Sequence, residues 1–204
     1  MVEQIKFLDE NGTFTLRGPE NVSGLYFPLA SGTGLKSALS PNLGGDAKLD
    51  QETFLLEPVS IEDLHASRAT RNIWCKVDGS GVWSVTGVSA EQELVKFSPA
   101  QDDSQVTAGF MRHTLERTCR TFRLTAAVTA FVPKDRNVEI LLLSMENRGT
   151  YSRELSVYGA IPIYGRSAAN LRDHRNVTSM LHRIKTTEHG VLVKPTMSFD
   201  ERGH

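Results

Sequence analysis

The fold is decided by one stretch in the middle of the chain, Leu124-Thr125-Ala126-Ala127-Val128-Thr129-Ala130-Phe131-Val132. Counted from Leu124, every second residue is Leu, Ala or Val, and the residues between them are Thr, Ala or Phe. This alternation has a period of two, as in a β-strand with one face in a core, and differs from the helical period of 3.6. The sequence therefore predicts a strand over 124–132.

Further strand signals follow this stretch along the chain. Residues 138–145 form a mostly apolar run of strand length, which predicts a strand buried on both faces. Residues 155–163 alternate again, and residues 191–193 are short and strand-like. Together these segments predict a protein dominated by strands.

Two hairpins are expected earlier in the chain. The first covers residues 5–16, where Asn11-Gly12 separates two strand signals, and the second covers 77–85 around Asp78-Gly79. Asn, Asp and Gly accept the positive φ angles of tight hairpin turns, which is why such pairs mark them.

Helical signals are weak, and their scarcity beside many strand signals indicates the fold class. Ser60 stands three positions before Asp63, which resembles a capping box and predicts one or two helical turns there. No segment sustains a long amphipathic helix. Many short strands separated by Gly, Pro, Asn and Asp are typical of an all-β, antiparallel β-sandwich. We expect one domain over residues 1–204, with no linker or repeat inside it.

The composition of the chain excludes several classes of binding partner. The 204 residues carry a formal net charge of −1 and are 39% hydrophobic, which argues against a nucleic-acid-binding domain and against disorder. The longest apolar runs fall far short of the roughly 18 residues needed to span a membrane. Cys75 and Cys119 stand far apart, in no metal-binding spacing, and the amino terminus has no signal-peptide pattern. We therefore expect a cytoplasmic protein with no nucleic-acid or membrane partner and no metal.

The first polar cluster, residues 62–74, is a candidate binding site. It ends in Arg71, Asn72 and Trp74, and such a set suits carbohydrate, because an aromatic ring covers C–H patches while guanidinium and amide groups donate hydrogen bonds. The alternative is a structural ion-pair network with Trp74 in the core. The residues alone leave both interpretations open.

A second and a third cluster carry further charged side chains. The second follows a predicted strand, and its directed hydrogen-bonding groups predict a binding loop at Arg172, Asp173, His174, Arg175 and Asn176. The alternative is a solvated connection. The third cluster is expected along the solvent face of a sheet and consists of Arg112, Arg117, Arg120 and Arg123. The chain has no HExxH, GxSxG or phosphate-loop motif, so the residues alone predict no catalytic group.

Several segments along the chain form a recognisable series: LYFPLA at 25–30, LGGDAK at 43–48, FLLEPVS at 54–60, EDLH at 62–65, SRATRNIW at 67–74, WSVTG at 83–87 and RDHRNVTS at 172–179. In this order they resemble the opening part of glycoside hydrolase family 94 phosphorylases, formerly glycosyltransferase family 36. The likeness is strongest to the 1,2-β-oligoglucan phosphorylases, and cellobiose phosphorylase-like enzymes are more distant.

This resemblance implies an amino-terminal β-sandwich of the galactose mutarotase-like supersandwich type, followed by a helical linker and a catalytic (α/α)6 barrel. It implies a cytoplasmic homodimer that binds a β-glucan oligosaccharide and cleaves it by inverting phosphorolysis. Inorganic phosphate attacks the anomeric carbon in place of the activated water of inverting hydrolases, and an Asp on the barrel is the general acid. The products are α-glucose 1-phosphate and a shortened glucan, and no cofactor is needed.

The chain departs from this pattern because it ends at His204, before any barrel. We therefore expect the front portion of a larger enzyme and assign no catalytic residue. In the family, a sandwich loop can border the neighbouring subunit's pocket, and the resemblance places residues 172–176 in that role. The alternatives are a cellobiose phosphorylase-like domain, a free-standing carbohydrate-binding module that uses Trp74 or Trp83, and a remnant of a split gene.

Overall fold

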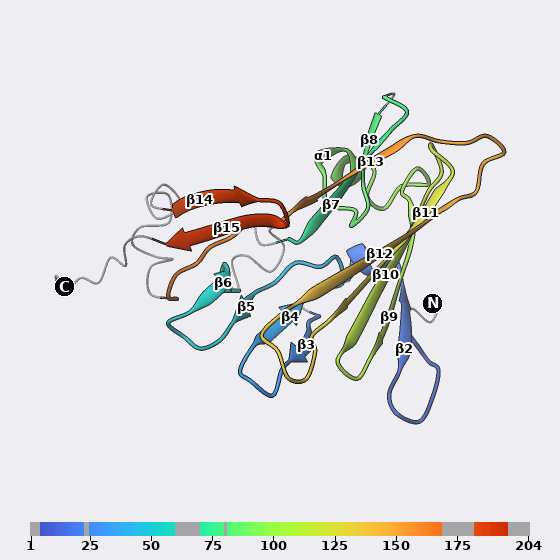
Figure 1. The fold of residues 1–204 in the computed structure, drawn as a ribbon. Coiled ribbons are helices and arrows are strands. Elements are labelled where there is room, and N and C mark those ends of the chain that lie inside the picture. The colour runs from blue at the N-terminus through green and yellow to red at the C-terminus, as the bar shows by residue number, and fades with distance from the viewer. Residues whose placement is uncertain (1–4, 23–24, 60–69, 80, 169–181, 196–204) are drawn as a thin grey trace.

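A computed structural model describes residues 5–22, 25–59, 70–79, 81–168 and 182–195 (Figure 1). In these residues nearly all regular structure is β-strand, arranged in four antiparallel sheets. The predicted all-β, antiparallel class is confirmed. None of the helices in the described ranges combines the length and apolar character that crossing a membrane requires.

The largest sheet has six strands and runs diagonally through Figure 1. Its strand order is β1-β2-β9-β10-β11-β12, and every neighbouring pair is antiparallel. The bounds of its strands are β1 (Ile5–Phe7), β2 (Phe14–Arg17), β9 (Asp103–Gly109), β10 (Arg112–Cys119), β11 (Leu124–Phe131) and β12 (Ile140–Asn147). The strand predicted from the alternating stretch is β11, near the edge of this sheet.

Three smaller sheets and two short helices complete the described fold. The four-stranded sheet contains β3 (Phe27–Ala30), β4 (Lys36–Leu39), β5 (Ala47–Lys48) and β6 (Phe54–Leu56). The three-stranded sheet has the order β13-β7-β8, with bounds Leu155–Ala160, Asn72–Val77 and Gly81–Ser84. The remaining elements are the hairpin of β14 (His182–Thr187) and β15 (Gly190–Pro195), the 3-10 helix η1 (Pro19–Asn21) and the helix α1 (Ala90–Leu94).

One hydrophobic core joins the large sheet to the three- and four-stranded sheets. Leu124 and Val128 enter it from β11, Val77 enters it from β7, and Leu39 enters it from β4. The apolar residues at every second position of β11 are therefore those that face the core, because successive side chains of a strand point to opposite faces. Burial of these apolar faces is the main force that holds the layers together.

Both predicted hairpins are confirmed. Strands β1 and β2 pair around a turn in which Gly12 has a φ of 85°. Strands β7 and β8 pair around Asp78 and Gly79, with φ angles of 48° and 68°. These angles explain why Asp and Gly stand in the second turn, since side chains other than Asn and Asp rarely adopt them.

The prediction for residues 138–145 was wrong in one respect. They include most of β12, but this strand lies at the edge of the six-stranded sheet and only one of its faces meets the core. Leu141 and Leu143 pack against the core, whereas Leu142 between them is 61% exposed. An apolar run of strand length does not by itself distinguish a central strand from an edge strand. The capping box predicted at Ser60 and Asp63 lies outside the described residues.

Candidate functional site

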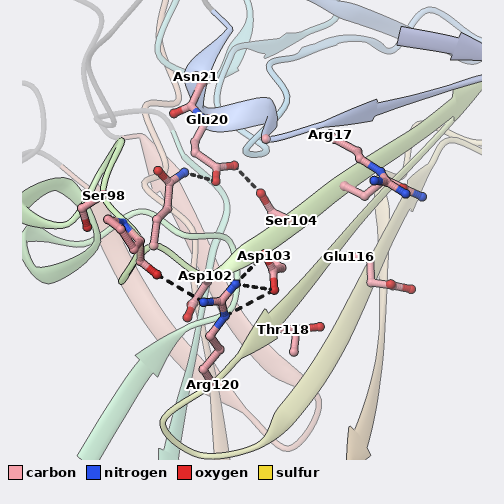
Figure 2. Close-up of a pocket in the computed structure, with 14 residues that line it drawn as sticks. Arg17, Glu20, Asn21, Ser98, Asp102, Asp103, Ser104, Glu116, Thr118 and Arg120 are labelled. Carbon is pink, nitrogen blue, oxygen red and sulfur yellow. Dashed lines mark hydrogen bonds and ion pairs between the residues drawn. The ribbon is translucent and has the colours of Figure 1, made fainter. Parts of the chain in front are cut away.

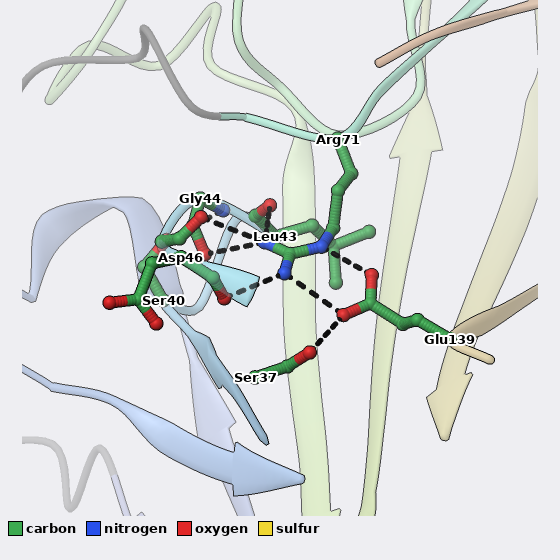
Figure 3. A network of polar contacts seen from close by, with 8 residues as sticks. Ser37, Ser40, Leu43, Gly44, Asp46, Arg71 and Glu139 are labelled. Atoms are coloured by element: carbon green, nitrogen blue, oxygen red, sulfur yellow. Dashed lines mark hydrogen bonds and ion pairs between the residues drawn. The ribbon is translucent and has the colours of Figure 1, made fainter. Parts of the chain in front are cut away.

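Arg71, which the sequence singles out for sugar binding, lies inside the protein (Figure 3). Its side chain is 1% exposed. Its Nη1 and Nη2 donate to the backbone carbonyls of residues 43–46 at 3.0–3.3 Å. Its Nε and Nη2 also meet the carboxylate of Glu139, with Nη2 2.9 Å from Oε2. The guanidinium is thus surrounded by acceptors from the protein itself.

The loop around Arg71 has a backbone shaped to receive it. Leu43 and Gly45 have φ angles of 63° and 103°, and a methyl group at Gly45 would overlap the carbonyl of Ala38. These conformations turn several carbonyls toward one guanidinium and tie the four-stranded sheet to Glu139, just before β12. Arg71 therefore supports this loop, and its predicted contact with sugar stays a prediction.

Asn72 is the centre of a second buried network. Its Oδ1 accepts hydrogen bonds from Ser84 Oγ at 2.9 Å and Thr86 Oγ1 at 2.6 Å. Its Nδ2 donates to the carbonyl of Val88 at 2.8 Å, and the Val88 amide donates to Ser84 Oγ. The network fixes the end of β8 and the turn that follows it, and its side chains are buried.

The two tryptophans lie on opposite faces of the three-stranded sheet. Trp83 faces the core, is 3% exposed, and donates from Nε1 to the carboxylate of Asp102 at 3.0 Å. Trp74 lies on the outer face, is half-buried, and stands opposite Tyr158 of β13. Of the three predicted residues in the first polar cluster, Trp74 is the one whose side chain reaches the surface. The second predicted loop, residues 172–176, lies outside the described residues, so its binding role stays a prediction.

A polar cleft of about 470 Å³ opens on the outer side of the six-stranded sheet (Figure 2). Glu20 of η1 lies at one side, where its carboxylate accepts from Gln101 and Ser104. At another side, Arg120 meets both carboxylate oxygens of Asp103 at 2.9 and 3.0 Å. The cleft offers donors and acceptors of both charges, but its lining includes neither His nor Cys.

The arginine cluster predicted on the solvent face is divided between two faces. Arg112 and Arg120 are exposed, but Arg117 is 1% exposed and its Nη2 lies 3.4 Å from Glu20 Oε2. Arg112 and Arg117 are separated by five positions, so on one strand they must point to opposite faces. Gly87 is required here, because a methyl group on it would overlap the Arg117 guanidinium.

The described residues contain no cluster suited to metal binding, and both cysteines are buried. They hold no group of three or more His, Cys, Asp or Glu side chains able to ligate a metal. Burial raises the pKa of the Cys75 and Cys119 thiols, which keeps both protonated and poorly nucleophilic.

Comparison with known families gives a match. The family description "Glycosyl hydrolase 94, supersandwich domain" matches residues 54–202, well over half of the chain. The chain therefore belongs to the glycosyl hydrolase 94 supersandwich domain family. Comparison with curated proteins gives no match. The resemblance to family 94 is thus confirmed, and the finer likeness to 1,2-β-oligoglucan phosphorylases stays a prediction.

Proposed function

We propose that residues 1–204 form the single amino-terminal domain of an inverting β-glucan phosphorylase. The reaction of the whole enzyme would convert a β-1,2-oligoglucan and phosphate into α-glucose 1-phosphate and a shortened glucan. The family match over residues 54–202 carries this proposal. The family resemblance implies a general acid on the barrel, so this domain would assist the reaction through substrate binding and assembly.

Exposed apolar side chains support a role in assembly. On the β14–β15 hairpin, Ile184, Val191 and Leu192 are 67%, 61% and 60% exposed. Apolar groups that gather on one small element are typical of a surface that another part of a protein covers. We propose that the catalytic barrel of the same enzyme covers this hairpin and that the complete enzyme is a cytoplasmic homodimer.

The test is phosphate release from α-glucose 1-phosphate with sophorose or cellobiose as the acceptor. The 204-residue chain is compared with the product of the gene extended into the next reading frame, and reactions without acceptor are the control. We expect activity in the extended protein alone, with sophorose the better acceptor. Better use of cellobiose would favour a cellobiose phosphorylase-like enzyme. Activity in neither protein would overturn the proposal.

A further inference from the structure

The outer face of the three-stranded sheet carries aromatic, polar and apolar side chains at defined positions. The antiparallel register places Tyr158 opposite Trp74, and Ser156 opposite Lys76. On the other side of β7, Val82 stands opposite Lys76. The face therefore presents a row that contains two aromatic residues, beside a row with a hydroxyl, an ammonium and an apolar group.

These side chains are accessible. Tyr158 is 58% exposed and Val82 is 52% exposed, and Lys76 and Ser156 are also exposed. Trp74 is half-buried, so its ring is held in place while part of it stays open to solvent. Opposite residues on paired strands are about 5 Å apart, so one sugar unit and its neighbour can cover both rings.

The face is held rigid at both ends. At one end, the Asn72 network fixes the end of β8 against the start of β7. At the other end, Asp78 after β7 accepts from Arg153 Nη1 and from the Glu154 amide, both at 2.6 Å. This second contact ties the β7–β8 turn to the residue before β13. A surface ordered before binding loses little conformational entropy when a ligand arrives.

The composition of the face selects one ligand class. Lys76 is the one charged residue among the five named positions, so the face lacks the repeated cations that a phosphate backbone or an acidic protein needs. Aromatic rings with hydrogen-bonding groups at their edge match a neutral polyhydroxylated ligand, whose C–H faces cover the rings and whose hydroxyls meet the polar groups.

We propose that Trp74 and Tyr158 form a platform that binds a glucan chain, with Lys76 and Ser156 bonding to sugar hydroxyls. The choice of glucan as the ligand rests on the proposed function, whereas the location rests on the register and exposure of these residues. Such a platform holds a long substrate on the enzyme between successive rounds of phosphorolysis.

Affinity electrophoresis tests the platform directly. The 204-residue chain is run in native gels that contain soluble β-1,2-glucan or a soluble β-1,4-glucan derivative, and dissociation constants are taken from the retardation. We expect Trp74→Ala and Tyr158→Ala each to weaken binding by about tenfold, as the loss of one aromatic contact predicts. Trp74→Phe and Tyr158→Phe should recover much of the loss. The matched control is Tyr151→Ala, an 82% exposed tyrosine in a turn, which should bind like the parent chain.

Three outcomes decide the proposal. Failure of the parent chain to bind any neutral glucan would overturn it, and so would equal binding by the parent and both alanine variants. Loss of binding in Trp74→Ala and Tyr158→Ala, with circular dichroism unchanged, would support it. The phosphate-release assay measures a different property, the turnover of the extended protein, so its failure is distinguishable from failure of the platform. An extended protein that lacks phosphorolysis but needs Trp74 for glucan binding would keep the platform and reject the proposed function.

Discussion

Two arginine–carboxylate pairs in this chain share one chemistry in opposite surroundings. Arg71 meets Glu139, and Arg120 meets Asp103, each through two guanidinium nitrogens (Figures 2 and 3). The side chains of the first pair are 1% and 10% exposed, and those of the second are 58% and 71% exposed. Burial makes each charge depend on its partner, because water no longer solvates it. Contact geometry alone therefore does not reveal which pair supports the fold.

The largest effect is expected from Arg71→Ala. The substitution leaves Glu139 buried without its cation and the carbonyls of residues 43–46 without their donor, so we expect the free energy of unfolding to fall by about 3–5 kcal/mol. Urea unfolding followed by circular dichroism measures this loss. The double variant Arg71→Met, Glu139→Leu should recover part of it, because no unpaired charge remains. A loss below about 1 kcal/mol for Arg71→Ala would contradict this prediction, because it would mean that the Arg71–Glu139 pair contributes no more to stability than an exposed ion pair.

Lowering the pH should destabilise the fold through His113, which is buried and senses the charge of Arg71. This residue is fully buried on β10, its ring centroid lies 5.0 Å from that of Phe27, and its ring nitrogens have no hydrogen-bond partner among the described residues. Burial, with a contribution from the Arg71 charge, lowers the pKa of His113 from 6.5 to about 4. Between these values the unfolded chain binds more protons than the folded one, so stability falls as the pH falls.

The expected loss from this group is about 3 kcal/mol between pH 6.5 and pH 4, and it levels off below that range. Urea unfolding at a series of pH values measures it. The control is His113→Leu, which removes the titrating group and should flatten the profile in this window. Identical pH profiles for the parent and the variant would contradict the assignment to His113.

The neutral network around Asn72 should contribute less to the free energy of unfolding than the charged network around Arg71. Asn72→Ala removes the acceptor of Ser84 and Thr86 and the donor to Val88, all inside the protein. We expect the free energy of unfolding to fall by about 1–3 kcal/mol, the cost of leaving buried polar groups without partners. Thermal and urea unfolding measure the change, with Ser156→Ala on the exposed face as the control. A loss larger than that of Arg71→Ala would reverse the order of the two networks.

The sequence could predict what depends on neighbouring residues along the chain. The alternation in residues 124–132 gives the buried face of β11, and Asp78-Gly79 gives a turn. The opposite orientations of Arg112 and Arg117 follow from their odd separation within one strand, so this signal was present in the sequence. The exposed face of β12 had no such signal, because an apolar run does not show whether another layer of the protein covers both faces of the strand.

The two ion pairs could not be predicted from the sequence, because each joins residues that are far apart along the chain. Arg71 and Glu139 are 68 positions apart, and nothing in either local sequence indicates that they meet. The polar cleft likewise joins η1 to residues near 98–105 and to β10. The sequence left Trp74 open as a sugar contact or a core residue, and it could not tell whether Trp74 or Trp83 reaches the surface. That distinction depends on which face of the three-stranded sheet the large sheet covers.

The smallest effect is expected from Arg120→Ala, and it completes the comparison with Arg71. Both partners of this pair are solvated without each other, so we expect the free energy of unfolding to fall by no more than about 1 kcal/mol. The remaining interaction should weaken further between 50 mM and 1 M NaCl, because salt screens exposed charges. Urea unfolding at the two salt concentrations measures both effects. A loss of about 3 kcal/mol that is independent of salt would mean that the cleft around Arg120 excludes water in solution, and that the contrast between the two pairs is one of degree.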